Sequence, residues 1–226
     1  MMASERPGIF LCTTILLLSL GRTGCGQATS GQRHDVQNWN DVQFSVPVTK
    51  RIDFLLLGHL RIGDNLRRPV DERIGVGFSF GLNQYVTLSG SDLHIEMQPV
   101  GALTLHEERL SFGATMRFPL RGFTLSDRNV FEHRFRRPQI NATRYRNRLQ
   151  VEHPFGPKQA KLTLFVSDEV FYDWSLNVWK RNRFSIGLSR KFKKHFTGDL
   201  YYLRQNDSHT RLGDLHVIGT TMRFHL

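Results

Sequence analysis

Apolar and polar residues alternate along most of the chain with a period of two. Between Arg73 and Asn83, large apolar side chains occupy every second position, and small or polar side chains occupy the positions between them. The apolar positions are Ile74, Val76, Phe78, Phe80 and Leu82. Because successive side chains of a strand point to opposite faces of a sheet, the pattern predicts a strand with one apolar face and one small, polar face.

The same alternation, stronger in some segments than in others, predicts strands along the whole chain after residue 28. The predicted strands are 36–48, 51–63, 73–83, 85–97, 108–118, 122–136, 142–154, 160–172, 180–191, 195–206 and 214–226. Most exceed the ~5–6 residues typical of soluble strands and suit a tilted membrane crossing of ~9–11 residues. The pattern predicts an all-β fold, an antiparallel up-and-down transmembrane β-barrel of about 10–12 strands. The predicted segments number eleven, whereas bacterial single-chain barrels have even numbers of strands. We therefore expect ten or twelve strands in the barrel.

The connections between the predicted strands alternate in length. Short connections are predicted at 82–85, 119–122 and 191–195, and longer polar ones at 63–72, 98–107, 173–180 and 206–213. Bacterial outer-membrane barrels have short periplasmic turns and longer external loops. The alternation therefore favours a barrel of the bacterial outer membrane, with membrane lipid and lipopolysaccharide around it.

The first 28 residues have the organisation of a secretory signal peptide. Arg6 gives a positive start, residues 8–20 form an apolar segment, and residues 26–28 approximate a cleavage site of small residues. The apolar segment is shorter than the ~20 residues that a membrane-spanning helix needs. We therefore expect residues 1–28 to be removed and residues 29–226 to form a single barrel domain.

Both cysteines of the chain, Cys12 and Cys25, precede the expected cleavage site. Cleavage after Ala28 would leave a chain without thiols, which excludes disulfides, thiolate metal ligands and a cysteine nucleophile. An alternative is a lipoprotein signal, in which Cys25 becomes acylated after cleavage. Arg22 disfavours this alternative, because such signals have an aliphatic residue at that place.

The chain is strongly basic, with a formal net charge of +11 at pH 7. A basic excess usually indicates nucleic acid or an anionic membrane surface as a partner. Export disfavours nucleic acid, and no zinc-ligand spacing or recognition-helix pattern supports it. The phosphate groups of lipopolysaccharide are the expected counter-charges.

Two neighbouring predicted strands, 122–136 and 142–154, each carry a row of arginines and a glutamate on one face. An arginine that faces lipid near the bilayer midplane costs ~2–4 kcal/mol, so these rows are expected to face the lumen. There they need carboxylate partners, because an isolated buried charge is far more costly than a paired one. The predicted lumen charge network consists of Arg128, Glu132, Arg134, Arg144, Arg146, Arg148, Glu152, Glu169, Arg181, Arg183 and Asp199. It serves either as a structural network that fills and rigidifies the barrel or as a pore lining that attracts a small anionic solute.

Aromatic residues with a polar edge are candidates for belts at the membrane interfaces, where such rings favour headgroup depth. The candidates are Trp39, Tyr172, Trp174, Trp179, Tyr201 and Tyr202. The core of a soluble protein would use the same residues, so they do not by themselves distinguish the two classes.

The chain ends on an alternating segment whose apolar phase includes Phe224 and Leu226. This segment resembles the terminal strand that the barrel-assembly machinery of the outer membrane recognises, although Leu226 stands where a final aromatic residue is usual. We therefore expect that machinery as a partner. The alternative is the last strand of a soluble β-sandwich.

Four short segments carry a resemblance to a known family. They are Arg144-Tyr145-Arg146-Asn147-Arg148-Leu149, Asp168-Glu169-Val170-Phe171-Tyr172, Asn182-Arg183-Phe184 and Tyr201-Tyr202-Leu203-Arg204-Gln205-Asn206. With them the chain resembles the domain-of-unknown-function 2490 family of Gram-negative bacteria over residues 36–226. The resemblance implies an outer-membrane-like barrel. The family has no established activity from which a catalytic residue could be carried over.

No residue pattern predicts an enzyme, a metal site or a cofactor. The ten histidines include no pair at the spacing that gathers two ligands on one helical face. The nearest catalytic candidates are Glu132 with His133 and Ser208 with His209, and the period of two sends Glu132 and His133 to opposite faces.

We therefore expect a non-enzymatic outer-membrane barrel, either structural or a narrow, anion-preferring pore. One alternative is a lipid-active hydrolase embedded in the barrel wall. The other is a soluble periplasmic β-barrel that binds a small apolar ligand.

Overall fold

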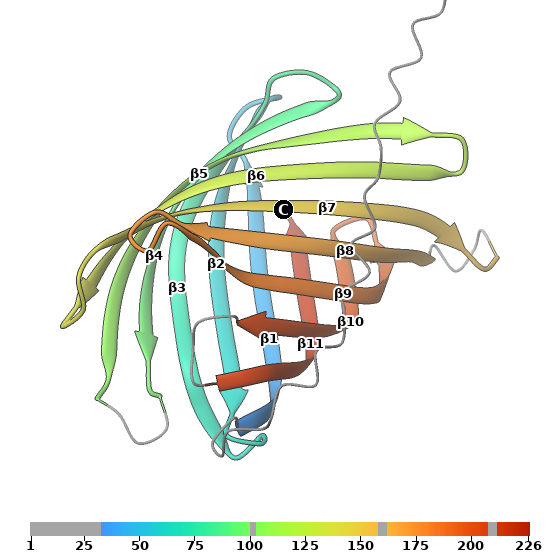
Figure 1. Cartoon of the computed structure of the whole chain (residues 1–226). Coiled ribbons are helices and arrows are strands. Elements are labelled where there is room, and N and C mark those ends of the chain that lie inside the picture. The colour runs from blue at the N-terminus through green and yellow to red at the C-terminus, as the bar shows by residue number, and fades with distance from the viewer. Residues whose placement is uncertain (1–32, 100–102, 158–161, 208–211) are drawn as a thin grey trace, which may run out of the picture. The chain divides into compact units, whose positions relative to one another are not determined.

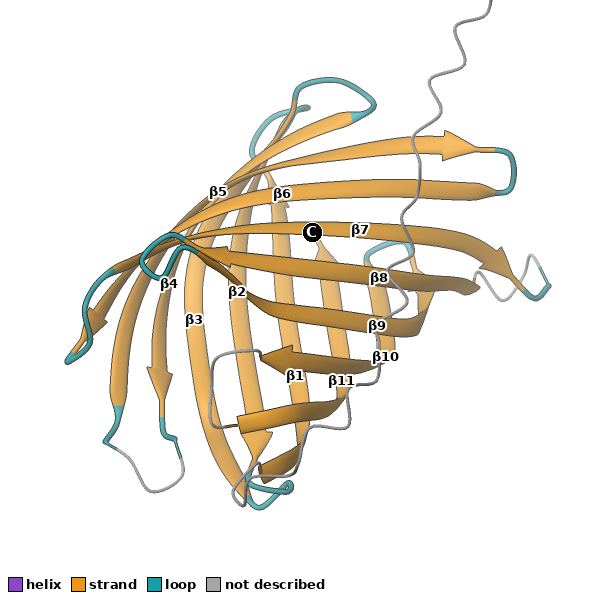
Figure 2. Ribbon diagram, in the orientation of Figure 1, coloured by secondary structure: helices purple, strands orange, loops and turns teal. Residues whose placement is uncertain are grey.

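The computed structural model describes residues 33–99, 103–157, 162–207 and 212–226. Every regular element in these residues is a β-strand (Figure 2). The predicted signal peptide, residues 1–28, lies outside the described residues, as do residues 208 and 209. In the described part of the chain, no helix is long and apolar enough to cross a membrane.

The strands follow one another around a closed barrel in the order of the sequence (Figure 1). They are β1 (Arg33–Pro47), β2 (Ile52–Gly63), β3 (Arg68–Gly81), β4 (Val86–Met97), β5 (Leu105–Leu120), β6 (Phe123–Arg137), β7 (Ala142–Phe155), β8 (Leu162–Asp173), β9 (Val178–Lys193), β10 (Phe196–Asp207) and β11 (Leu212–His225). Each predicted strand corresponds to one of them, including the weakly patterned segment 85–97. The prediction of an all-β, up-and-down barrel is confirmed.

The expectation of an even number of strands is wrong, because the described residues close a barrel of eleven. Chain direction alternates from strand to strand, so an odd number makes β1 and β11 run the same way. The two strands close the barrel as a parallel pair, in which Trp39 is opposite Gly219 and Phe44 is opposite Phe224. The other neighbouring strands pair in antiparallel fashion, as with β5 and β6. A parallel ladder still pairs the backbone groups, so the closure leaves no open edge.

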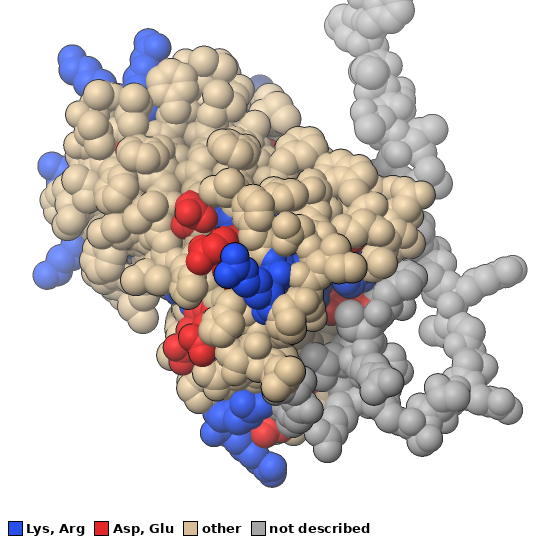
Figure 3. Space-filling model, turned by 90° about the vertical axis from the view of Figure 1, so that its left-hand side faces the viewer, with Lys and Arg blue, Asp and Glu red and all other residues tan. Residues whose placement is uncertain are grey.

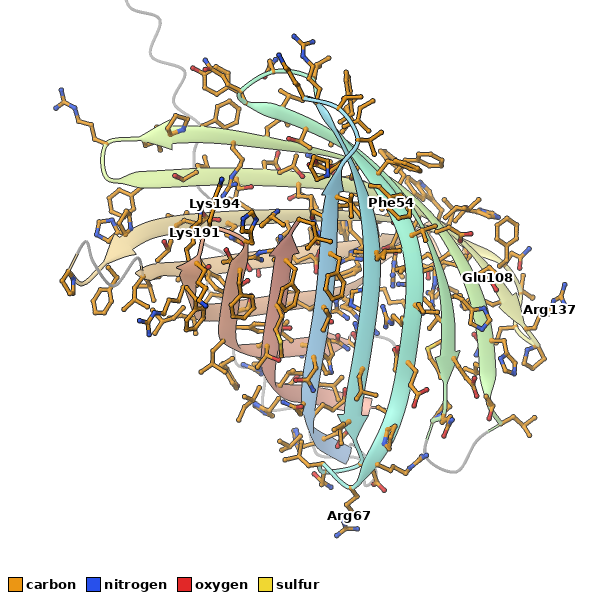
Figure 4. The ribbon with its side chains drawn as sticks, turned by 180° about the vertical axis from the view of Figure 1, so that it is seen from behind. Phe54, Arg67, Glu108, Arg137, Lys191 and Lys194 are labelled. Carbon is orange, nitrogen blue, oxygen red and sulfur yellow. The ribbon has the colours of Figure 1, made fainter. Side chains whose placement is uncertain are left out.

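The barrel has two ends, which we name after a residue in a turn at each. The Arg67 end carries the turn between β2 and β3 and the start of β1. The Lys194 end carries the turn between β9 and β10 and the end of β11, where the His225 N–H donates to the His195 carbonyl. Figure 4 shows Arg67 and Lys194 far apart on the barrel.

The difference between short and long connections is smaller than predicted. The segment 63–72 contains only a turn at 64–67, because β3 begins at Arg68 and pairs with β2 as far as Gly63. The segment 173–180 likewise shortens to a turn at 174–177. Backbone pairing does not depend on side-chain polarity, so the ladders continue through polar residues that the sequence pattern assigned to loops.

Large apolar side chains cover the outside of the barrel. Ile74 is 70% exposed and Phe112 is 67% exposed, and both belong to the apolar phase from which their strands are predicted. Glycines and small polar residues alternate with them on the inner face, as Gly75 and Gly77 do in β3. The two faces of the wall therefore differ in polarity, as the period of two requires.

The inside of the barrel differs between its two halves. Toward the Arg67 end, Trp39, Leu203, Leu215 and Val217 form a buried apolar cluster. Toward the Lys194 end, small hydroxyl side chains line the wall: Ser89, Ser126, Ser189, Thr197 and Thr221. The apolar cluster lies in one half of the barrel, and small polar side chains are frequent on the inner wall of the other.

Two aromatic residues that the sequence places among the interfacial candidates lie inside the barrel. Trp39 is only 3% exposed in the apolar cluster, and Tyr201 packs against the same cluster. The Tyr201 ring lies over Gly219 of β11, where a Cβ atom would come within 2.1 Å of the ring. Trp174 and Trp179 are exposed, and both make ring contacts with Tyr172. Alternation shows which side chains of a strand share a face, and the closed barrel shows that the face of Trp39 and Tyr201 is the inner one.

Candidate functional site

A large cavity of about 1700 Å³ runs through the inside of the barrel. Among the described residues, its walls include fifteen Lys or Arg and nine Asp or Glu. The lining therefore carries an excess of positive charge. Figure 3 shows one face of the molecule, on which acidic and basic side chains lie side by side near the middle and further basic side chains project at the edges.

The arginine rows of β6 and β7 reach this cavity because alternate residues of each strand point inward. Arg144, Arg146 and Arg148 all line it from β7. The antiparallel register places Glu132 of β6 opposite Arg144 and Arg128 opposite Arg148. The pairing of these two strands therefore decides which charges become neighbours.

Glu132 is almost fully buried and holds two arginines of β7. Its Oε1 accepts a hydrogen bond from Arg146 Nη1 at 2.6 Å, and its Oε2 accepts one from Arg144 Nε at 2.7 Å. The Glu132 side chain is only 2% exposed. Charge-assisted hydrogen bonds of this kind are about twice as strong as neutral ones, so they compensate part of the cost of burying the carboxylate.

Glu169 of β8 is the second centre of the network. Its Oε1 accepts hydrogen bonds from Arg146 Nη2 at 2.7 Å and from Arg128 Nη2 at 2.9 Å. Its Oε2 lies 3.7 Å from Arg183 Nη1 of β9. Arg146 bridges Glu132 and Glu169, so one continuous network joins strands β6 to β9.

A third buried carboxylate of the lumen is absent from the set predicted from the sequence. Glu107 of β5 is fully buried and pairs with Arg109 and Arg134, each at 2.6 Å. The predicted strand began at residue 108, one position too late to include it. The signal was available: Glu107 and Arg109 are two residues apart, so a strand that includes both places them on one face.

Asp71 of β3 makes a further group that the sequence analysis missed. It pairs with Arg73 at 2.5 Å and with Arg61 of β2 at 3.4 Å. Residue 71 falls in a loop predicted from the sequence, so its place on the inner face does not follow from the pattern. The longer β3 seen in the structure brings it into the lumen.

Two aromatic rings lie among the guanidinium groups. The buried Phe171 ring has Arg146 and Arg183 at 4.8 Å from its centroid and Arg144 at 5.0 Å. The Trp39 ring has Arg61 at 3.9 Å and Arg183 at 4.8 Å. A guanidinium over a ring face gains roughly 2 kcal/mol when desolvated, so the rings help the carboxylates to hold these cations inside the barrel.

The remaining predicted members lie inside the barrel but outside the central network. Glu152 pairs with Arg117 at 2.9 Å, and Asp199 pairs with Arg223 at 2.7 Å. Arg181 pairs with Asp207 at 2.5 Å. Arg148 lines the cavity but makes no hydrogen bond or ion pair with any residue that the structure describes. The predicted set is thus brought into one lumen, where it forms several separate groups.

The outer face is less uniformly apolar than the sequence pattern indicates. Asn147 of β7 donates hydrogen bonds to Asp127 Oδ1 at 2.6 Å and to Asn129 Oδ1 at 3.0 Å. On β4 and β5, His94 Nδ1 contacts Glu108 Oε1 at 2.5 Å, and both side chains are about half exposed. Polar side chains on an outer wall are satisfied here by pairing with one another.

The catalytic candidates from the sequence do not converge. Glu132 points into the lumen, whereas His133 contacts Thr143 Oγ1 at 2.9 Å and is exposed on the other face of the strand. Ser208 and His209 lie outside the described residues. Across the part of the chain that the structure covers, no three His, Cys, Asp or Glu residues gather to hold a metal ion.

Comparison with solved structures finds similar proteins, of which LpxR supports the barrel fold. LpxR from Salmonella typhimurium is similar with a TM-score of 0.50 and 8% sequence identity, over 77% of this chain and 83% of that protein. An anion-selective porin from Comamonas acidovorans gives a TM-score of 0.41 and 15% identity over 78% of this chain. The match covers 54% of the porin, so this chain spans about half of its length.

Comparison by sequence gives a family but no individual relative. No curated protein matches the chain. The sequence profile of a family described as "Protein of unknown function (DUF2490)" matches residues 36–214, which is most of the chain. The chain therefore belongs to the DUF2490 family.

Proposed function

We propose that the protein is a barrel of the bacterial outer membrane whose lumen acts as a narrow, anion-preferring pore. The observation that carries this proposal is the excess of guanidinium groups over carboxylates inside the barrel. Each carboxylate of the central network already contacts at least two arginines, as Glu107 does. Positive charge therefore remains in the cavity, and a wall lined with one sign of charge raises the local concentration of counter-ions.

The distribution of side chains across the wall supports the membrane location. Apolar residues such as Ile74 and Phe112 are more than half exposed on the outside, while charged side chains pair inside. A water-soluble barrel would present this apolar surface to solvent, which is unfavourable over a large contiguous area. The acyl chains of a membrane match this apolar outer surface.

The two ends of the barrel suggest its orientation and its contacts. The shortest turns, 121–122 and 194–195, lie at the Lys194 end, which suits the periplasmic side. The Arg67 end would then face outward, where the exposed Arg67 and Arg137 (Figure 4) meet lipopolysaccharide phosphates. Strand β11 ends on the periplasmic side, where the barrel-assembly machinery would recognise it.

The pore proposal is tested by reconstituting the protein in planar bilayers under a KCl gradient. The reversal potential is expected to lie toward the chloride equilibrium potential. Arg128→Gln should reduce the anion preference, because Arg128 faces the cavity. Lys194→Gln, in an exposed turn, is the matched control and should leave it unchanged. Absence of conductance would refute the pore and leave a structural barrel, whereas a cation preference would refute the charge argument.

The location is tested separately by cell fractionation. Recovery in the outer-membrane fraction with heat-modifiable migration on gels is the expected result. Recovery as a detergent-free soluble protein would reject the membrane location and favour a periplasmic barrel that binds a small apolar ligand.

A second candidate function, a lipid-active hydrolase, is favoured by one feature of the outer face. An apolar groove of about 540 Å³, lined in part by Leu56, Ile74 and Val76, ends at His94 and Glu108. A histidine oriented by a carboxylate is the arrangement of a general base. Hydrolysis of phospholipid or lipid A by the purified protein, lost in His94→Ala, would support this candidate. An inactive wild-type protein would reject it.

A further inference from the structure

Arg128 and Arg148 face each other across the β6–β7 ladder inside the barrel. The register places them directly opposite, and both line the cavity. Like charges at directly opposed positions destabilise a sheet. A pair of this kind requires compensating negative charge: among the described residues, Glu169 pairs with Arg128 at 2.9 Å, whereas no carboxylate pairs with Arg148.

Nearby carboxylates are already occupied. Glu169 lies opposite Arg148 in the β7–β8 register, but its two oxygens contact Arg128, Arg146 and Arg183. Glu152 accepts hydrogen bonds from Arg117 and from Gln150, the latter at 2.7 Å. Neither carboxylate makes a hydrogen bond or ion pair with Arg148 among the described residues.

The hydrogen-bonding groups of the two arginines are correspondingly unsatisfied. The Nε atoms of Arg128 and Arg148 are buried without any acceptor among the described residues. Arg128 uses only Nη2, in its contact with Glu169. A buried donor without an acceptor is unfavourable, and the two like charges repel each other, so the pair is expected to recruit an anion from the lumen.

The arginine pair is accessible from the cavity of the barrel. The Arg128 side chain is 31% exposed, whereas that of its partner Glu169 is 7% exposed. The next inward-facing residues toward the Lys194 end are Ser126 and Gln150, which are opposite each other. These side chains are smaller than the arginines and aromatic rings on the other side of the pair, so an anion in the cavity can approach Arg128 and Arg148 from the Lys194 end.

We propose that Arg128 and Arg148 form a binding site for a phosphate-type oxyanion in the lumen. Guanidinium forks bind pairs of oxygen atoms, and phosphate offers enough oxygens for two forks, whereas a carboxylate offers only one pair. The inference deepens and rests on the proposed anion-preferring lumen, since it names the class of anion. The phosphate belongs either to a free phosphate or phosphomonoester or to a lipid headgroup.

Binding is tested with inorganic phosphate as the probe and the detergent-solubilised mature protein in phosphate-free buffer. Isothermal titration should give a saturable signal in the wild type. Arg148→Gln should weaken it by about 10- to 100-fold, the effect of losing charge-assisted hydrogen bonds. Arg148→Lys, which keeps the charge but loses the fork, should fall between the two. Arg117→Gln, in the lumen but already paired with Glu152, is the control and should bind like the wild type.

A measurement of unfolding stability tests the proposed site independently of binding. Without phosphate, Arg148→Gln should unfold at the same or a higher urea concentration than the wild type, because it removes an unpaired buried charge. Added phosphate should raise the midpoint of the wild type and leave that of Arg148→Gln unchanged. A midpoint of Arg148→Gln clearly below that of the wild type would overturn the proposal.

The source of the phosphate is distinguished by competition. If vesicles of lipopolysaccharide displace inorganic phosphate in the wild type, the headgroup is the ligand; if they do not, the ligand is a free phosphate. Equal phosphate binding by the wild type and Arg148→Gln, or none by the wild type, would overturn the site. Titration in detergent does not depend on conductance. Phosphate binding through Arg148 without ion conductance would therefore refute the pore and leave the binding site intact.

Discussion

Replacing Glu169 by glutamine should destabilise the barrel strongly, because Glu169 holds three arginines together. The carboxylate contacts Arg146 at 2.7 Å, Arg128 at 2.9 Å and Arg183 at 3.7 Å. Glutamine has nearly the same shape, so the change leaves no cavity. It removes the negative charge and turns one acceptor into an amide donor that faces a guanidinium.

The expected size of the effect follows from the burial of the group. Only 7% of the Glu169 side chain is exposed, and breaking a buried ion pair costs about 3–5 kcal/mol of unfolding free energy. The glutamine carbonyl can still accept one of the hydrogen bonds, which places the expectation near the lower limit, about 3 kcal/mol. The matched control is Glu152→Gln, whose partner Arg117 is 55% exposed and whose loss should cost at most about 1 kcal/mol.

The assay is urea unfolding of both variants in lipid vesicles, followed by tryptophan fluorescence and by heat-modifiable migration. The difference between the two variants should be about 2 kcal/mol or more. Equal losses for Glu169→Gln and Glu152→Gln would refute the reasoning, since the two sites differ in burial and in the number of arginines that each carboxylate holds.

Three further predictions test the placement of individual side chains. Ile74→Arg on the outer face should cost about 2–4 kcal/mol in vesicles, whereas Ser91→Arg in the lumen should cost much less; equal costs would contradict the assignment of faces. Gly219→Val should destabilise the barrel by about 1–3 kcal/mol through a clash with the Tyr201 ring, and Tyr201→Ala should relieve the clash in a double-mutant cycle. In a variant that retains Trp39 as its single tryptophan, brominated lipids should leave the emission unquenched, because the ring is buried inside the barrel.

The amino-acid sequence by itself determined the strands and the polarity of their faces. Alternation located β3 and β5 because a strand between two environments of different polarity must repeat every two residues. It also placed the arginines of β6 and β7 on one face, since their charge excludes them from an apolar surface. These are properties of one strand at a time.

The tertiary structure decided everything that depends on which strands are neighbours. Barrel closure decides how an odd number of strands is accommodated, because β1 meets β11 and pairs with it in parallel. The same closure carries Trp39 into the interior. The partners of Glu107 and the lack of a partner for Arg148 also follow from the register between strands. The period of two assigns each side chain to one face of its strand. Interaction energies depend on the distances between side chains of neighbouring strands, and these distances are set only when the barrel has closed.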